Sequence, residues 1–279
     1  MTGAAPHVVV TGAGGFVGGF LARWLAERGT EVTAHTRQRA DLRTPGSLPR
    51  RFDALIHCAA ETPERCPEPA KLYERNMDLA RSVFDQALAA GALSVVFLSS
   101  MSAYGSVSVA ELTEDTPPGE LDPYGRAKRD SESLLEKCVG RGLPSALTIR
   151  LPGTVGKGSH DNFLSVFLGR VLRGEKLKGR NPDALFNNVV YVGDLAAFLE
   201  AWTTKPRPGY AVTNLAASDP LPMREVLALL CSSAGREPNF EFDSGGKKPF
   251  LISLERARSL GYKAASVRSS IEDFVQDCL

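Results

Sequence analysis

Apolar residues in the first half of the chain form short runs that alternate with longer stretches of helical periodicity. The runs predict strands over residues 8–11, 31–36, 54–58, 94–98 and 146–151. Apolar positions three or four residues apart predict helices over residues 16–28, 70–90 and 123–140. Strands that alternate with helices pair in parallel through right-handed crossovers, so the pattern predicts an α/β fold built on a doubly wound parallel sheet.

The second half of the chain is less regular and predicts a small α/β lobe. Helices are expected over residues 163–173, 223–234, 253–260 and 269–278, and a strand over 189–192 precedes a helix that begins at Asp194. No linker rich in serine and proline separates the halves. We expect residues 1–152, with about 187–215, to form a nucleotide-binding lobe, and about 153–186 and 216–279 to form a C-terminal substrate lobe.

A glycine-rich segment follows the first strand and opens the first helix. Gly12 permits a sharp turn, Gly15 permits a pyrophosphate to approach the backbone, and Gly18 permits the helix to pack on its strand. The helix N-terminus at Phe16 and Val17 offers free N–H groups to phosphates. The segment predicts dinucleotide binding in a Rossmann sheet; a glycine-rich turn without a ligand is the alternative.

The end of the second predicted strand indicates which dinucleotide is bound. A carboxylate there would accept a bond from the free 2′-hydroxyl of NAD, but Thr36 is followed by Arg37, Gln38 and Arg39. The planar guanidinium of Arg37 suits the 2′-phosphate of NADP. We therefore predict NADP over NAD, against the alternative that these arginines are solvated surface charges.

Tyr124 and Lys128 lie one helical turn apart at the start of the helix after Pro123. A neighbouring ammonium favours the phenolate and is expected to lower the tyrosine pKa toward the working range. Ser100 follows the fourth predicted strand, at the sheet edge where open parallel sheets bind ligands. We predict Ser100, Tyr124 and Lys128 as catalytic residues, with Ser100 also binding the substrate oxygen and Tyr124 and Lys128 also contacting the cofactor.

Together these motifs resemble the extended short-chain dehydrogenase/reductase family, the group that contains NAD-dependent sugar-nucleotide epimerases and dehydratases. The resemblance extends to residues 56–60, 99–105 and 191–196, and so covers nearly the whole chain. It implies Ser-Tyr-Lys hydride chemistry, a homodimer formed through residues 70–90 and 123–140, and a substrate-binding Asn162. It also implies further cofactor-binding residues, which are Asp41, Leu42, Ala59, Ala60 and Asn76.

Departures from the family pattern restrict the chemistry and the substrate. Met101 and Ser102 occupy the positions of the Asp-Glu pair that eliminates water in dehydratases, so dehydration is not expected. The segment Asn187-Asn188 stands where many relatives carry an arginine for a nucleotide diphosphate. The remaining cationic candidates for a diphosphate, with surface charges as the alternative, are Arg180, Lys247 and Lys248. Asn162 would equally serve as an ordinary helix N-cap.

Composition excludes several classes of protein. Lysine and arginine total 33 against 32 acidic residues, a net charge of +1 that argues against a general nucleic-acid binder. No apolar run is long enough for a membrane span and no signal peptide is recognised, so we expect a cytoplasmic protein without membrane association. Five cysteines without a C-x-x-C pair, and four histidines without ligand spacing, predict reduced thiols and no metal site.

These observations lead to an expected NADP-dependent oxidoreductase that reduces a keto group, on a nucleotide-linked sugar as substrate. Three alternatives remain. The first is a sugar-nucleotide epimerase that retains NAD or NADP, and the second is a reductase of a small non-sugar carbonyl compound, favoured by the missing diphosphate arginine. The third is a non-catalytic NADP-sensing protein, in which a tyrosine and lysine at acid–base spacing would have no purpose.

Overall fold

The computed structural model describes residues 5–243 and 249–279, which group into two compact units. The first unit comprises Met1–Val107, Pro117–Arg150 and Ala196–Thr213, and the second comprises Ser108–Thr116, Leu151–Leu195 and Asn214–Leu279. Residues 108–116 and 187–195, which the sequence pattern assigns to the nucleotide-binding lobe, therefore group with the second unit.

A six-stranded sheet in the order β11-β6-β4-β3-β1-β2 forms the centre of the first unit. β1 pairs in parallel with both β2 and β3, and β3 pairs in parallel with β4. This confirms the predicted doubly wound α/β sheet. Its strands are β1 (His7–Thr11), β2 (Glu31–His35), β3 (Ala54–His57), β4 (Ser94–Ser100), β6 (Ser145–Leu151) and β11 (Gly209–Asn214).

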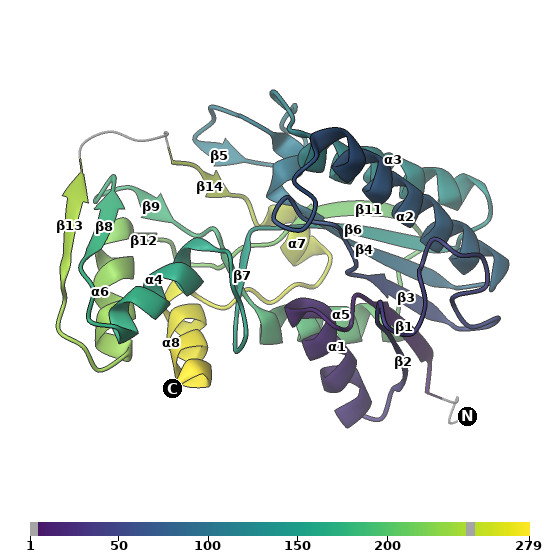
Figure 1. Cartoon of the computed structure of the whole chain (residues 1–279), viewed down its shortest axis with the longest axis horizontal. Helices are drawn as coiled ribbons and strands as arrows, with labels where there is room; N and C mark the ends of the chain where they lie inside the picture. The colour runs from purple at the N-terminus through teal and green to yellow at the C-terminus, as the bar shows by residue number, and fades with distance from the viewer. Residues whose placement is uncertain (1–4, 244–248) are drawn as a thin grey trace. The chain divides into compact units, whose positions relative to one another are not determined.

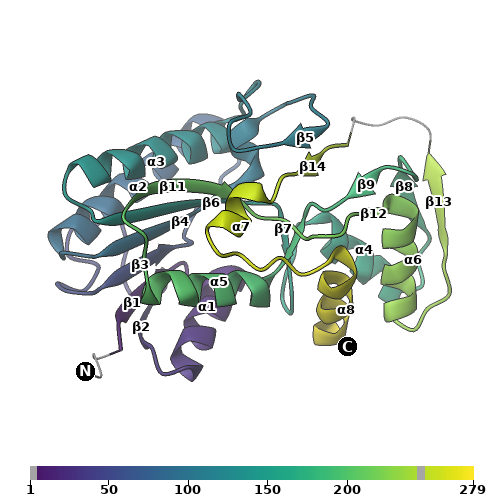
Figure 2. The same cartoon turned by 180° about the vertical axis from the view of Figure 1, so that it is seen from behind.

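Helices cover both faces of this sheet, as Figures 1 and 2 show. α2 and α3 lie on one face, and α1 and α5 lie on the other. Side chains from the sheet and from α2 and α3 form one buried apolar cluster that includes Val9, Leu55, Phe84, Phe97 and Leu135. The helices are α1 (Phe16–Glu27), α2 (Pro69–Ala89), α3 (Pro123–Gly140) and α5 (Val192–Thr204), and the 3₁₀ helix η1 (Met101–Tyr104) follows β4.

Small two-stranded sheets and helices make up the second unit. β7 pairs with β10, β9 with β12, β8 with β13 and β5 with β14. Its strands are β5 (Glu111–Leu112), β7 (Gly153–Val155), β8 (Leu177–Arg180), β9 (Leu185–Phe186), β10 (Val189–Tyr191), β12 (Leu221–Pro222), β13 (Phe240–Asp243) and β14 (Leu251–Ile252). Its helices are α4 (Phe163–Leu172), α6 (Met223–Ser233), α7 (Glu255–Ser259) and α8 (Val267–Cys278).

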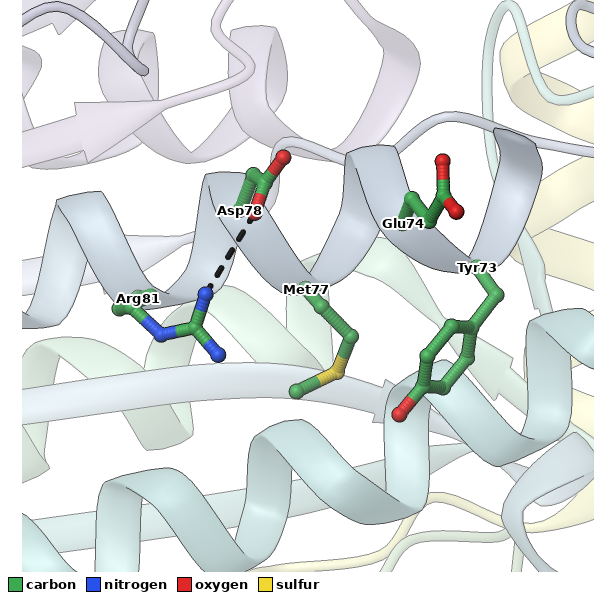
Figure 3. A pocket seen from close by; sticks show the side chains of 5 residues that line it. All are labelled: Tyr73, Glu74, Met77, Asp78 and Arg81. Carbon is green, nitrogen blue, oxygen red and sulfur yellow. Dashed lines mark hydrogen bonds and ion pairs between the residues drawn. The ribbon is translucent and has the colours of Figure 1, made fainter. Parts of the chain in front are cut away.

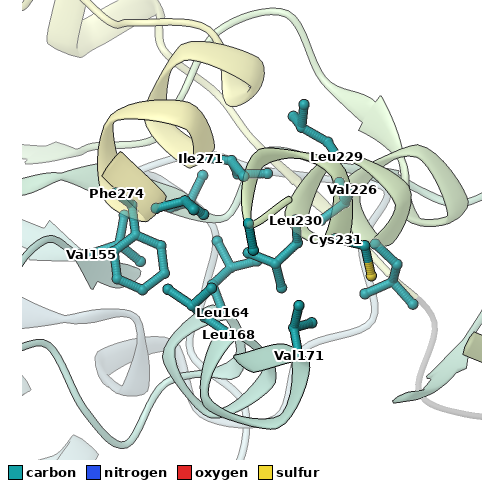
Figure 4. Close-up of a cluster of buried hydrophobic side chains, with 14 of the residues drawn as sticks. Val155, Leu164, Leu168, Val171, Val226, Leu229, Leu230, Cys231, Ile271 and Phe274 are labelled. Atoms are coloured by element: carbon teal, nitrogen blue, oxygen red, sulfur yellow. The ribbon is translucent and has the colours of Figure 1, made fainter. Parts of the chain in front are cut away.

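The second unit has its own apolar core, built by α4, α6, α8 and β7 (Figure 4). Leu164, Leu168, Leu230, Ile271 and Phe274 each expose no more than 3% of their surface. The helices predicted over 163–173 and 223–234 are thus amphipathic helices that face each other across this core. No described helix of the chain is both long and apolar enough to cross a membrane.

Several helix boundaries in the second half differ from those that periodicity predicts, among them α7, which is Glu255–Ser259 rather than 253–260. α8 begins at Val267 rather than at 269, because the Ser266 hydroxyl caps it by accepting a hydrogen bond from the Ser269 amide. α5 begins at Val192, directly after β10, so Asp194 lies in its first turn rather than at its start. The predicted elements have no counterpart for β11 of the central sheet or for the short strands β5, β7, β8, β9, β12, β13 and β14.

Candidate active site

The glycine loop joins β1 to α1 in the geometry that the sequence predicts. Gly12 has a left-handed φ of +71°, and a Cβ there would approach the Ala59 amide nitrogen to 2.7 Å. A Cβ at Gly18 would collide with the Gly12 carbonyl oxygen, so the helix packs on the loop through a missing side chain. At Gly15, by contrast, the nearest atom to an added Cβ is the Gly12 oxygen at 3.4 Å. Protein atoms therefore crowd Gly12 and Gly18 but leave space beside Gly15 in front of the helix.

The N-terminus of α1 suits an anion. Gly15 is its N-cap and provides no capping side chain, and no acidic residue lies in the first turn. The first amide N–H groups, at Phe16 and Val17, have no partner within the helix and carry the positive end of its dipole. A pyrophosphate in the space beside Gly15 would meet these groups without a competing carboxylate from α1.

Asn76 on α2 holds the loop Ala59–Glu61 that follows β3. Its side-chain oxygen accepts a hydrogen bond from the Glu61 amide at 3.0 Å, and its nitrogen donates to the Glu61 carbonyl at 3.0 Å. The same nitrogen donates to a carbonyl one turn earlier in α2. Asn76 is buried and its amide is engaged with the protein backbone. It therefore shapes the loop that carries Ala59 and Ala60, where the resemblance implied a direct cofactor contact.

The residues after β2 are engaged in ways that the sequence did not indicate. Arg37 pairs with Glu61 at 3.0 Å. Asp41 receives hydrogen bonds from the guanidinium of Arg43, at 2.9 and 2.8 Å, which hold the pKa of that carboxyl below its usual value. Leu42 is buried in the apolar core beside α2. Whether Arg37, Asp41 and Leu42 border a bound cofactor stays a prediction.

Ser100 and Tyr124 come from two elements that pack directly on each other. Ser100 ends β4 and caps η1, accepting a hydrogen bond from the Ser102 amide at 3.1 Å. Tyr124 is the second residue of α3. Gly125 lies so close to the Ser102 carbonyl oxygen that a Cβ would collide with it. A side chain at this glycine would push η1 away from the first turn of α3.

Lys128 fixes α3 to the end of β4 from the other side. Its ammonium donates a hydrogen bond to the Leu98 carbonyl at 2.8 Å and lies 5.6 Å from the centroid of the Tyr124 ring. Only 5% of Lys128 is exposed. The tyrosine and the lysine therefore do share one face of α3, as their spacing predicts; Lys128 is buried there and Tyr124 is half-buried.

The electrostatics of this pair differ from the sequence-based expectation. Burial raises the pKa of Tyr124 to about 12, with further increases from Glu64 and Asp122. Burial lowers the pKa of Lys128 to about 8. The expected lowering of the tyrosine pKa by the lysine is not found, because desolvation of the phenolate dominates. Tyr124 is therefore protonated at neutral pH, and its role as a proton donor stays a prediction.

A buried imidazole lies next to the lysine. His57 ends β3, and its Nδ1 lies 2.7 Å from the Thr11 hydroxyl oxygen. Burial and the positive charge of Lys128 lower the pKa of His57 to about 3. The ring is therefore neutral and serves as a hydrogen-bonded core residue between neighbouring strands.

The sequence-based predictions missed a buried ion pair between Glu132 of α3 and Arg150 of β6. Glu132 accepts hydrogen bonds from Arg150 at 2.7 and 3.1 Å and from the Ser99 hydroxyl at 2.5 Å. The guanidinium also lies 4.6 Å from the centroid of the Tyr104 ring. The available signal was an acid four residues after Lys128, on the same helix face. An arginine inside an otherwise apolar strand was the complementary signal.

Asn162 caps α4 in the second unit. Its side-chain oxygen accepts a hydrogen bond from the Ser165 amide at 3.0 Å, and its nitrogen donates to the Thr154 carbonyl at 3.2 Å. This is the N-cap role that the sequence left open beside substrate binding. Contact with a substrate stays a prediction.

The residues considered as ligands of a diphosphate lie in different environments. Asn187 is buried and clamps the Ile252 backbone through both its amide oxygen and its amide nitrogen, at 3.0 and 2.8 Å. It therefore joins β14 to the rest of the second unit. Arg180 ends β8 and is exposed. Lys247 and Lys248 lie outside the described residues.

A hollow of about 390 Å³ lies on the surface of α2, and Figure 3 shows the side chains that line it. It contains none of the predicted site residues and is lined by Tyr73, Glu74, Met77, Asp78 and Arg81. Within residues 5–243 and 249–279, no three histidine, cysteine or acidic side chains gather to hold a metal ion.

Residues 8–216 match the model of the NAD dependent epimerase/dehydratase family. The chain belongs to this family. The match covers the glycine loop, Ser100, Tyr124 and Lys128, and it confirms the resemblance found in the sequence. Members are enzymes that use NAD or NADP, so the predicted class of enzyme is confirmed at this level.

Known members of the epimerase/dehydratase family are similar to the chain at modest identity. A UDP-glucose 4-epimerase of Azospirillum brasilense is 28% identical over 169 residues, which is 52% of this chain and 49% of that protein. The matched part thus spans about half of the length of that relative.

Two solved structures align over almost the whole chain. RMD from Pseudomonas aeruginosa, complexed with NADPH, is 25% identical with a TM-score of 0.81 and covers 98% of this chain and 99% of its own. MoeE5 in complex with UDP-glucose and NAD is 25% identical with a TM-score of 0.78 and covers 97% of each chain. The family members therefore share the fold of both units.

Proposed function

We propose that this epimerase/dehydratase-family enzyme is an NADP-dependent reductase of a keto group on a nucleotide-linked sugar. The observation that carries the proposal is the pairing of the half-buried Tyr124 with the buried Lys128 on one face of α3, with the ammonium 5.6 Å from the centroid of the tyrosine ring. A reductase needs an acid at this position, whereas an alcohol oxidation needs a base. The similar structures that hold NADPH, and UDP-glucose with NAD, support the cofactor class and the substrate class.

The residues present fit a dinucleotide. The space beside Gly15 and the N-terminus of α1 would hold the pyrophosphate, and Arg37 would meet a 2′-phosphate. NADPH supplies the hydride when bound. Tyr124 then donates its phenolic proton to the carbonyl oxygen, and the Ser100 hydroxyl holds that oxygen by a hydrogen bond. Lys128 binds the ribose next to the nicotinamide and offsets negative charge as the phenol loses its proton.

The test is single-turnover oxidation of NADPH with keto-sugar nucleotides chosen by thermal-shift screening. Tyr124→Phe should lower turnover by about a hundredfold or more while cofactor affinity changes little. Ser100→Ala should lose less, because it removes one hydrogen bond. Tyr73→Phe is the matched control, since that hydroxyl bonds to Asp130 outside the site.

Two results would reject this proposal. Near-wild-type turnover in Tyr124→Phe would show that the tyrosine is not the acid. Tight NADPH binding without reduction of any carbonyl compound, sugar-linked or small, would favour the NADP-sensing alternative.

A second candidate is an epimerase that oxidises and then reduces one carbon of a nucleotide sugar with retained cofactor. The UDP-glucose 4-epimerases among the relatives favour it. It requires Tyr124 to act first as a base in the oxidation and then as an acid in the reduction. An NMR assay distinguishes the two, because an epimerase converts the sugar without net consumption of NADPH.

We also propose a homodimer formed through α2 and α3. The two helices pack together through Tyr73, whose hydroxyl donates to Asp130 at 2.8 Å and whose ring lies 5.1 Å from the Arg126 guanidinium. The hollow in Figure 3 opens on the same helix. Sedimentation velocity tests the proposal, because a charge-reversed Glu74→Lys variant should weaken self-association if this face is the interface.

A further inference from the structure

An ion pair joins the two loops that flank the end of β1. In the parallel sheet β1 lies between β2 and β3, and Thr11 is in register with His35 on one side and His57 on the other. Arg37 lies two residues beyond β2 and Glu61 four residues beyond β3. Their side chains meet at 3.0 Å, from Nη2 of the guanidinium to Oε1 of the carboxylate. The pair therefore spans the sheet edge at which the glycine loop begins.

The two partners differ in how firmly the protein holds them. Only 13% of the Glu61 side chain is exposed, against 70% for Arg37. Asn76 clamps both the amide and the carbonyl of Glu61, so the backbone that carries the carboxylate is fixed. The carboxylate is thus the fixed partner, and the guanidinium is held over it from solvent.

The pair presents two opposite chemistries to a ligand. Oε2 of Glu61 is not used in the pair and can accept a hydrogen bond from a ribose hydroxyl. The guanidinium of Arg37 has five N–H donors and uses one of its nitrogens for Glu61, which leaves donors for a phosphate. A carboxylate this close also repels an incoming phosphate dianion, so Glu61 opposes the attraction that Arg37 provides.

We propose that Glu61 is a specificity-determining residue that reads the 2′ position of the adenosine ribose together with Arg37. It replaces the acid that the end of β2 lacks, and it limits the preference for a 2′-phosphate over a 2′-hydroxyl. The enzyme accordingly uses both cofactors, with NADP favoured only moderately. This inference rests on the proposed binding of a nicotinamide dinucleotide at the glycine loop.

The experiment measures calorimetric binding of 2′,5′-ADP (adenosine 2′,5′-bisphosphate) and of 5′-AMP, which differ only in the 2′ group. The variant is Glu61→Gln, which removes the charge, keeps the size and leaves the backbone bonds to Asn76 in place. Binding of 2′,5′-ADP should become stronger and binding of 5′-AMP weaker, so the ratio of the two affinities should shift at least tenfold toward the phosphate. Arg37→Ala should shift the same ratio at least tenfold in the opposite direction.

The matched control is Asp85→Asn, which breaks the exposed ion pair between α2 and Arg141. It should leave the ratio unchanged. An unchanged ratio in Glu61→Gln would overturn the inference. Weaker binding of 2′,5′-ADP in that variant would also overturn it, since the acid would then merely position Arg37.

Failure of the proposed function gives a different result. If wild type binds neither nucleotide nor either intact cofactor, the dinucleotide site itself is wrong and the inference falls with it. If wild type binds both but reduces no keto-sugar, the reaction is wrong while the ratio in Glu61→Gln still tests the reading of the 2′ position.

Discussion

Breaking the buried pair between Glu132 and Arg150 should destabilise the enzyme more than the loss of any exposed ion pair. The side chains are 5% and 4% exposed, and the pair is bidentate with a shortest distance of 2.7 Å. Ser99 donates a further hydrogen bond to Glu132 at 2.5 Å. Glu132→Gln keeps the shape of the side chain but leaves the arginine charge buried without a counter-charge.

The size of the effect follows from that uncompensated charge. Removing one partner of a buried ion pair costs about 3–5 kcal/mol. In a chain of this length, that loss corresponds to a fall in the midpoint of thermal unfolding of roughly 10 °C. Glu132 also acts to raise the pKa of Lys128, so the variant should lower that pKa further.

Differential scanning calorimetry at pH 7 is the direct assay. Asp85→Asn is the exposed control and should not shift the midpoint measurably, because solvent screens its pair with Arg141. The double variant Glu132→Gln, Arg150→Met removes both charges and should recover at least half of the loss. A midpoint for Glu132→Gln within about 2 °C of wild type would refute the reasoning, since a buried unpaired charge is expected to lower the free energy of unfolding by much more than such a shift represents.

Two further predictions concern the glycine loop and the buried lysine of α3. Gly18→Ala should strongly lower the unfolding midpoint or prevent folding, whereas Gly14→Ala should be tolerated, since its Cβ would find Thr36 atoms only at 3.9 Å; calorimetry of both variants decides. Burial lowers the pKa of Lys128 in the folded state from 10.5 to about 8. Between these two pH values the unfolded state binds one more proton than the folded state, so the free energy of unfolding rises with pH across that window, by about 3 kcal/mol. Urea unfolding at pH 7 to 10 should show this rise as a pH-dependent difference in the free energy of unfolding between wild type and Lys128→Met. The comparison is needed because Cys58, whose pKa burial raises to about 12, acts in the opposite direction above its ordinary pKa of 9 in both proteins. A pH-independent difference would contradict the lowered pKa of Lys128.

Much of the candidate active site could be predicted because its signals are local. A glycine loop between a strand and a helix needs a few adjacent residues, and its geometry at Gly12 and Gly18 matches the expectation. Tyr124 and Lys128 share a face because α3 begins where Pro123 and the Asp122 cap place it. What spacing could not supply was the electrostatic environment, since the pKa of a phenol depends on how much protein surrounds it.

The ion pairs near the candidate site could not be predicted from the sequence, for a different reason. Arg37 and Glu61 are adjacent only because β2 and β3 flank β1, and Glu132 meets Arg150 only because α3 packs on the sheet. No local pattern records these contacts. For Asn76 and Asn162, the residue type permitted both a ligand contact and a backbone contact, and the structure shows the backbone contact.

By itself, the sequence determined the alternation of strands and helices in the first half, the glycine loop and the placing of Tyr124 and Lys128 on one helix face, because each depends on neighbours a few positions apart. Only the tertiary structure decided the small sheets of the second unit. β8 and β13 are four-residue strands from distant segments that pair in parallel, and short strands of this kind acquire stability only from the core beneath them. The same holds for residues 108–116, whose strand β5 finds its partner β14 far along the chain. Their place is set by long-range packing, which no window of the sequence contains.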